Sequence, residues 1–187
     1  MKFPIIFIFL LSINNLVFGQ TINSNDIVIS TLLPDNFSGR YNFGVEYFLN
    51  KKNKNIENSK ISVGLNVGRI STFIKNQNIR GFNFIIESNW YTDLTLPKKW
   101  NEYGGLKIAY GNLSNETLKE KKNSYFIGIT TGVQPIILKK ITLKVNSDVG
   151  YVKNGLSTIN ESIFNNSDNV FYSGFAINFN VGLGVRF

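Results

Sequence analysis

The C-terminal part of the chain alternates between large apolar residues and small or polar ones. From Phe171 to Phe187 every odd position except Ser173 is large and apolar, and the even positions from Gly174 onward are Gly, Ala, Asn or Arg. Successive side chains of a β-strand point to opposite faces, whereas a helix would scatter these residues around its circumference. The pattern therefore predicts a strand with one apolar face and one narrow, polar face.

Seven earlier segments follow the same period of two. They are Ile27–Leu33, which is the weakest and ends before Pro34, and Tyr41–Leu49, Ile61–Gly68, Phe82–Trp90, Leu106–Gly111, Tyr125–Gln134 and Ile141–Tyr151. Only Ile85 interrupts the alternation within the Phe82–Trp90 segment. No stretch of helical periodicity separates the segments, which favours antiparallel neighbours over βαβ units. The sequence predicts an antiparallel sheet of eight strands.

The N-terminal segment has the organisation of a secretory signal peptide. Lys2 precedes the apolar run Phe3–Leu11, and Leu16–Gln20 ends with a small residue before a polar one. The run is shorter than the roughly 20 residues of a transmembrane helix. We expect cleavage after Gly19, which divides the chain into a signal peptide, residues 1–19, and a barrel domain, residues 20–187. The chain has no Cys, so neither a lipoprotein anchor nor a disulfide can form.

The chemistry of the two strand faces distinguishes a membrane barrel from a soluble one. One face is aliphatic and aromatic, with Tyr and Trp near strand ends, as in the girdles of membrane barrels. The other face carries Gly, Ser, Thr, Asn, Gln and charged residues, which are costly to bury in an apolar core. Strands in lipid must also close, because an open edge leaves backbone groups unpaired. We expect an all-β fold, an eight-stranded antiparallel up-and-down transmembrane β-barrel. The alternative is a soluble exported lipocalin-like barrel that binds a small apolar ligand.

Charged residues fall into two groups. The formal net charge is +8, and most Lys residues cluster in the connections between strands without forming a basic helix or an RNA-binding motif, so we expect no nucleic-acid partner. The charges predicted to face the lumen are Arg40, Glu46, Glu87, Lys107, Lys144, Asp148 and Arg186. Isolated buried charges are costly, and eight strands leave room only for side chains. We therefore expect a paired, hydrogen-bonded network that fills the lumen.

Residue types that are missing limit the chemistry. The chain contains no His and no Cys, which excludes thiol nucleophiles, thiolate metal sites and a Ser–His pair. Glu46 and Glu87 are the one pair of carboxylates that could be considered for acid–base work, and no cleft or other catalytic feature accompanies them. We expect no enzymatic activity, no catalytic residue, no cofactor and no metal. A lipid-modifying enzyme of the outer membrane is the least favoured alternative.

Several stretches resemble known bacterial proteins. The alternating Phe179, Val181, Leu183, Val185 and Phe187 are similar to the C-terminal signal of bacterial outer-membrane proteins. Gly44–Leu49 followed by Ile61–Leu65, and Glu87–Tyr91 before Gly105–Lys107, resemble the second to fifth strands of small OmpA-like eight-stranded barrels of Gram-negative bacteria. An Arg is common in that family where this chain has Asn89. The resemblance implies a place in the cell outer membrane, contact with outer-membrane lipid, recognition by the barrel-assembly machinery, and an envelope-structural or surface-interaction role.

The expected topology follows if both termini face the periplasm. The outer loops are then Asp35–Gly39, Lys75–Arg80, Asn112–Asn123 and Asn154–Asn169, and the periplasmic connections are Asn50–Lys60, Thr95–Tyr103 and Leu138–Lys140. Loops carry recognition more often than barrel walls do. Any surface partner is expected at the outer loops.

Overall fold

The computed structural model describes residues 26–32, 40–49, 60–74, 76–92, 100–137, 140–156 and 170–187. The strands in these ranges are β1 (Ile27–Leu32), β2 (Arg40–Leu49), β3 (Lys60–Ile74), β4 (Gln77–Thr92), β5 (Glu102–Asn115), β6 (Glu120–Val133), β7 (Ile136–Ile137), β8 (Ile141–Leu156) and β9 (Phe171–Arg186). Within the same ranges no helix has the length and apolar character needed to cross a bilayer. The predicted signal peptide, residues 1–19, lies outside the described residues.

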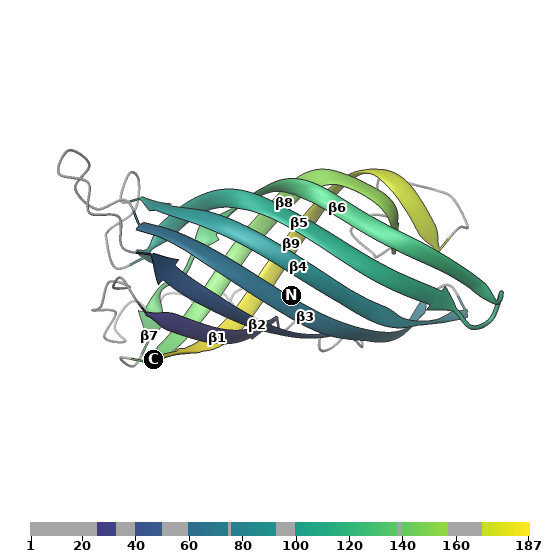
Figure 1. Cartoon of the computed structure of the whole chain (residues 1–187), viewed down its shortest axis with the longest axis horizontal. Coiled ribbons are helices and arrows are strands. Elements are labelled where there is room, and N and C mark those ends of the chain that lie inside the picture. Colours follow the sequence, from purple (N-terminus) through teal and green to yellow (C-terminus); the bar gives the residue numbers. More distant parts are fainter. Residues whose placement is uncertain are drawn as a thin grey trace, which may run out of the picture.

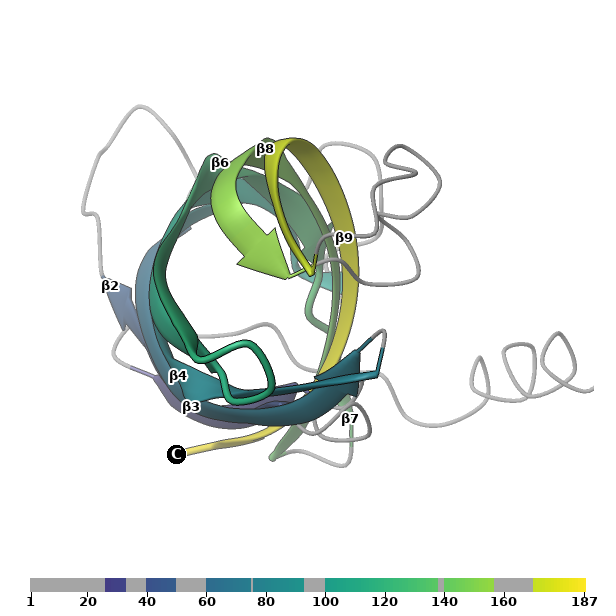
Figure 2. The same ribbon diagram turned by 90° about the vertical axis from the view of Figure 1, so that its right-hand side faces the viewer.

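The eight long strands form one closed antiparallel sheet. Neighbours along the chain pair in order, β6 pairs with β8, and β1 pairs with β9 to complete the circle (Figures 1 and 2). Closure leaves the barrel without an open edge over the length where these pairings hold. The predicted eight-stranded up-and-down barrel is confirmed. The two-residue β7 was not predicted. It lies in the connection between β6 and β8 and pairs with Ile141 and Thr142 at the start of β8.

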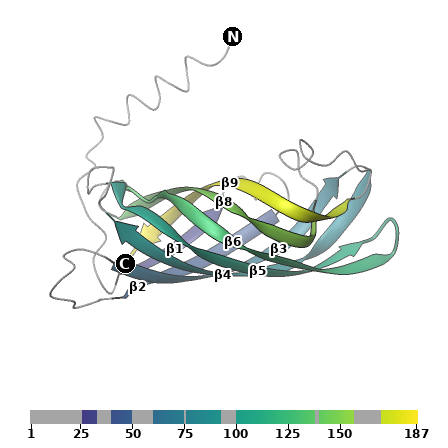
Figure 3. The ribbon, with the colours of Figure 1, turned by 90° about the horizontal axis from the view of Figure 1, so that it is seen from above.

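The two ends of the barrel are built differently, and we name them by what they contain. At the terminal end β1 begins and β9 ends, and Ile27 donates a backbone hydrogen bond to Phe187 over 3.2 Å. At the hairpin end β3 turns into β4, and β5 turns into β6 (Figures 1 and 3). Ile74 pairs with Gln77 across the first of these turns, and Asn76 has a φ of 60°, a left-handed value that Asn tolerates.

Two predicted outer loops are wrong in extent. Strand β4 already begins at Gln77, so Gln77–Arg80 belong to a strand where a loop was expected. Strands β5 and β6 extend to Asn115 and Glu120, which leaves four residues for the turn where Asn112–Asn123 was expected as a loop. Strand pairing continues beyond the apolar segments because backbone hydrogen bonds do not need the period-two pattern that marked the strands in the sequence.

The other predicted connections lie mostly outside the described residues. This holds for Asp35–Gly39, for residues 50–59, for residues 93–99 and for residues 157–169. At their described margins, Lys60 already begins β3, Glu102 begins β5, and Asn154–Leu156 belong to β8.

The outward face of the strands is apolar around the barrel. Phe175 is 78% exposed, Ile127 61% and Leu106 52%, and comparable residues occur on every long strand. Their partners one position along the chain point inward and are buried or half-buried. The predicted alternation therefore separates an apolar outside from a mostly polar inside.

The interior also contains large apolar residues, which differs from the polar lumen that we expected. At the terminal end Val28, Phe48, Tyr91, Tyr103 and Ile136 form one buried cluster. Toward the hairpin end a second cluster contains Ile70, Ile79, Leu113, Leu156 and Val170. Ile85 also points inward and is 6% exposed, so it follows the alternation as an apolar member of the inner face. Apolar side chains fill the ends of the lumen, and polar ones fill its middle.

Candidate functional site

A buried polar cluster in the middle of the barrel is the candidate functional site. Its five charged members are Glu46 of β2, Glu87 of β4, Lys107 of β5, and Lys144 and Asp148 of β8, and each is at most 8% exposed. Strand register places Glu87 directly opposite Lys107. Gly64 of β3 stands opposite both Glu46 and Glu87. Because Gly64 has no side chain, the two carboxylates have room on either side of it.

The five charges alternate in sign along a chain of ion pairs. Lys144 Nζ lies 2.7 Å from Glu87 Oε2 and 3.6 Å from Glu46 Oε2. Lys107 Nζ lies 2.7 Å from Asp148 Oδ2 and 3.5 Å from Glu87 Oε1. Each Lys therefore bridges two carboxylates, and Glu87 is the carboxylate that both of them share. Such pairing offsets part of the cost of removing charges from water.

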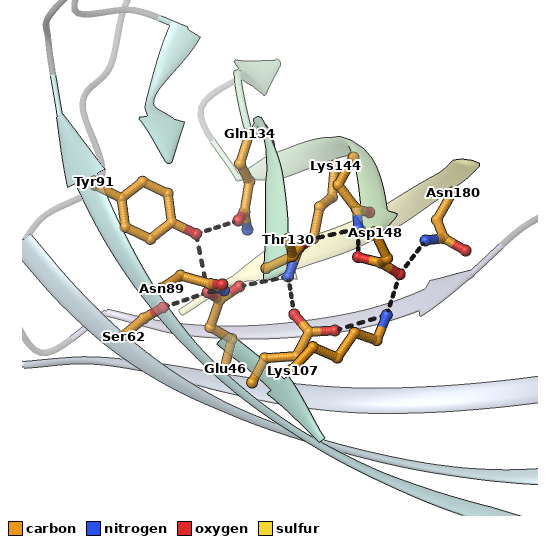
Figure 4. A network of polar contacts seen from close by, with 12 residues as sticks. Glu46, Ser62, Asn89, Tyr91, Lys107, Thr130, Gln134, Lys144, Asp148 and Asn180 are labelled. Carbon is orange, nitrogen blue, oxygen red and sulfur yellow. Dashed lines mark hydrogen bonds and ion pairs between the residues drawn. The ribbon is translucent and has the colours of Figure 1, made fainter. Parts of the chain in front are cut away.

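Neutral side chains donate hydrogen bonds to Glu46, the carboxylate at one end of this series of ion pairs. Glu46 Oε1 accepts hydrogen bonds from Ser62 Oγ, from Asn89 Nδ2 over 3.0 Å and from the Tyr91 hydroxyl over 2.9 Å. The Tyr91 oxygen also lies 2.6 Å from Gln134 Oε1. Glu46 thus receives a neutral amide here, together with two hydroxyl groups (Figure 4).

Neutral amides also donate hydrogen bonds to Asp148, the carboxylate at the other end of the series. Asp148 Oδ1 accepts from Asn146 Nδ2 over 2.8 Å, and Asp148 Oδ2 accepts from Asn180 Nδ2 over 2.8 Å. The cluster holds three carboxylates and two ammonium groups, so its charges alone do not balance. The five neutral donors of Ser62, Asn89, Tyr91, Asn146 and Asn180 supply the remaining stabilisation of negative charge.

The structure does not bring every predicted lumen charge into this cluster. Arg186 lies at the terminal end, where its Nη1 is 3.5 Å from Asp26 Oδ2. Asp26 was missed because it precedes the first alternating segment. Arg40 begins β2, and its side chain is not among those that the structure describes.

The sequence pattern placed Gln134 on the inward face at the end of the segment Tyr125–Gln134, but it assigned no face to Tyr91. Tyr91 shares the inward face of β4 with Glu87 and Asn89, so the alternation alone could have placed it inside. Tyr91 lies one residue beyond the predicted segment Phe82–Trp90. Gln134 was expected to point inward, and only the tertiary structure shows that it meets the Tyr91 hydroxyl.

A cavity of about 180 Å³ separates the polar cluster from the apolar residues of the hairpin end. Lys107, Asp148 and Asn180 line one side of it, and Leu113 and Leu156 line the other. Among the described residues, no three His, Cys, Asp or Glu side chains are grouped as metal ligands would be.

The predicted C-terminal signal lies on β9. Phe179 and Phe187 are 68% and 67% exposed, Leu183 and Val185 are also exposed, and Val181 is half-buried. All five residues share the outward face of the strand.

Comparison with known proteins identifies the fold. No family model matches the chain, and no curated protein sequence matches it. Among solved structures, the N-terminal β-barrel domain of Pseudomonas aeruginosa OprF aligns with a TM-score of 0.55 and 14% identity, over 88% of this chain and 98% of that domain. Neisserial surface protein A aligns with a TM-score of 0.44 and 11% identity, over 86% of this chain and 92% of that protein. The resemblance to small OmpA-like eight-stranded barrels is confirmed as a likeness of fold.

Proposed function

We propose that this chain is an integral outer-membrane β-barrel without enzymatic activity, with a lumen filled by side chains and an envelope-structural or surface-interaction role. The observation that carries the proposal is the apolar exterior of a closed barrel whose middle is polar. A water-soluble barrel would place its large apolar residues inside, around a ligand. Monomeric soluble proteins rarely expose contiguous apolar patches larger than a few hundred Å², and here the apolar face is continuous from strand to strand.

Three further features support the outer membrane as the location. The predicted signal peptide implies export. Seven of the eight barrel strands, all but β1, have 10 to 16 residues and suit a bilayer that needs about 9–11 residues per strand. The outward row from Phe179 to Phe187 is consistent with recognition by the barrel-assembly machinery during biogenesis. Outer-membrane lipid then contacts the apolar exterior, and an unidentified surface partner would bind at the outer loops.

The polar cluster supports a structural role over a catalytic one. All three of its carboxylates accept hydrogen bonds or ion pairs from neighbouring side chains, and the two apolar clusters lie between it and the barrel ends. A general acid or base needs a reacting group within hydrogen-bond reach. The enzymatic alternative has no comparable observation in its favour.

Membrane fractionation combined with heat-modifiable gel mobility tests the proposal. We expect the full-length protein to remain in the membrane pellet after alkaline extraction. Without boiling, the folded barrel should migrate differently from the boiled chain, because a closed sheet resists unfolding by detergent. A peripheral membrane protein carried through the same extraction serves as the control. Recovery in the soluble fraction with no mobility change on boiling would contradict the proposal and favour the soluble ligand-binding barrel.

A further inference from the structure

Two arginines stand side by side on the outward face near the hairpin end. Arg69 of β3 lies opposite Phe82 of β4, and Arg80 of β4 lies opposite Ser71 of β3. Arg69 and Arg80 are therefore diagonal neighbours across one strand pair, a relation that separates residues by about 7–8 Å and lies within reach of long side chains. Both side chains are exposed.

Neither guanidinium has an acidic partner among the described residues. The ion pairs there involve Lys107, Lys144 and Arg186, all of which point inward or lie at the terminal end. The diagonal placement concentrates two positive charges on a small area of the outward face. Among the described residues no acidic side chain forms an ion pair with either of them.

The residues that flank the two arginines define their height on the barrel. Tyr41 and Phe82 lie opposite Arg69 on its two neighbouring strands, and aromatic side chains favour the boundary between hydrocarbon and headgroups. The Phe82 ring centroid lies 6.2 Å from that of Tyr110, which lies 5.4 Å from that of Tyr125, so aromatic rings continue across β4, β5 and β6. Arg80 lies two residues nearer the hairpin end than Phe82, the cross-strand partner of Arg69.

Polar residues lie level with Arg80 on both neighbouring strands. Ser71 lies opposite Arg80 on β3, and Ser114 lies opposite it on β5. The Ser114 hydroxyl donates to Glu116 Oε1 over 2.8 Å. Lys121 of β6 continues the same row beyond Ser114 and is exposed. The acidic Glu116 thus lies at the β5–β6 turn, beyond Ser114. Arg80 and Lys121 are the cations of this row, and Arg69 lies diagonal to Arg80.

We propose that Arg69 and Arg80 together bind the phosphate of an anionic lipid in the leaflet at the hairpin end. The site rests on the proposed membrane insertion. Guanidinium groups bind phosphate through paired, charge-assisted hydrogen bonds. The acyl chains of such a lipid extend along the apolar face below, over residues such as Phe84 and Val67, which are 38% and 54% exposed. A soluble anion would gain only the arginine contacts, whereas a lipid phosphate gains these contacts and the apolar face.

Native mass spectrometry of the refolded full-length protein in zwitterionic detergent tests the site. The probe is lipid A, whose headgroup carries two phosphates, with phosphatidylcholine and inorganic phosphate as comparison ligands. The variant R69Q/R80Q removes both charges, and R69K/R80K keeps the charges without the paired hydrogen bonds. The matched control K140Q/K153Q removes two exposed cations before and on β8.

If Arg69 and Arg80 bind the lipid phosphate, the loss of lipid A binding should differ in size among the three variants. We expect affinity to fall at least about tenfold in R69Q/R80Q, by less in R69K/R80K, and to stay unchanged in K140Q/K153Q. Phosphatidylcholine should not distinguish the variants, and inorganic phosphate should not displace lipid A. Equal loss in R69Q/R80Q and K140Q/K153Q would indicate general charge attraction and overturn the site, as would unchanged binding in R69Q/R80Q.

The heat-dependent mobility shift separates failure of this site from failure of the proposed function. Both arginines are exposed and form no ion pair within the described chain, so R69Q/R80Q should keep the shift of the wild type. A variant that keeps the shift and still binds lipid A normally overturns the site and leaves the membrane barrel standing. A wild-type protein without any shift overturns both.

Discussion

At the scale of single residues, Glu87 illustrates how the barrel holds charge in its interior. Its carboxylate lies between Lys144 Nζ at 2.7 Å and Lys107 Nζ at 3.5 Å, and it is 4% exposed. The sequence predicted that Glu87, Lys107 and Lys144 face the same space, because all three occupy inward positions. It could not predict which partners meet, because Lys144 comes from β8, on another part of the barrel wall from β4. Side-chain reach across the lumen decides such contacts.

Removal of Lys144 should destabilise the barrel strongly. Lys144→Met keeps much of the side-chain volume but leaves Glu46 and Glu87 without their shared cation in a buried site. Breaking a buried ion pair in this way costs about 3–5 kcal/mol of unfolding free energy. The measurement is urea unfolding of the protein folded in lipid vesicles.

The double variant K144M/E87Q separates charge from packing. It removes one carboxylate together with the cation, so it should be more stable than Lys144→Met alone. Lys140→Met, at an exposed position, should change stability by no more than about 0.5 kcal/mol. Equal stability of Lys144→Met and Lys140→Met would show that the ion pairs contribute nothing to the fold.

At the scale of elements, β6 pairs directly with β8, although the short β7 lies between them in the chain. Gly128 lies opposite Gly150 in this pairing, and both glycines point inward beneath the Phe126 ring. A Cβ on Gly150 would lie 2.6 Å from Gly128 Cα and 2.8 Å from Phe126 Cζ, and closer still to the Ile127 carbonyl oxygen. The close approach of these strands therefore requires glycine.

Gly150→Ala should weaken this seam. Overpacking of a filled interior typically costs about 1–3 kcal/mol, because side chains or backbone must shift. The matched control is Gly104→Ala on β5, where the nearest atom to the added Cβ is the Thr130 carbonyl oxygen at 4.0 Å. The midpoint temperature of the heat-dependent mobility shift measures both variants. A midpoint for Gly150→Ala at or above that of Gly104→Ala would contradict the tight seam.

Elements also show where sequence patterns stop being informative. The alternation identified every long strand, but it ended early on β3, β4, β5 and β6, whose hairpin-end residues include polar positions on both faces. There, cross-strand contacts continue the pairing: Glu116 donates its backbone N–H to the Asn78 carbonyl over 2.8 Å and so joins the two hairpins. Such contacts between separate hairpins leave no mark in the local sequence.

At the scale of the whole molecule, the lumen is layered along its axis. Apolar residues around Tyr103 fill the terminal end, the charged cluster fills the middle, and apolar residues around Leu113 fill the hairpin end beyond the cavity. An ion would have to pass both apolar layers and compete with the internal ion pairs. The layering therefore supports a barrel that does not conduct.

Planar-bilayer recording tests this consequence. We expect the wild-type protein to give no reproducible single-channel steps under conditions in which a large porin does. Large, reproducible conductance would contradict the filled lumen and would favour an ion pathway through the cluster. Insertion is confirmed independently by the heat-dependent mobility of the same preparation.

The sequence by itself determined the class of fold, the number of long strands and the face on which each residue lies. It could do so because β-structure repeats every two residues. The apolar outer face and the polar inner face of a membrane barrel therefore appear as a local alternation along each strand. Only the tertiary structure decided which inward groups meet, that apolar layers fill both ends of the lumen, and that Arg69 and Arg80 become neighbours beside the aromatic residues Tyr41 and Phe82. These features depend on register and barrel closure, which bring together residues from strands that are distant in the chain.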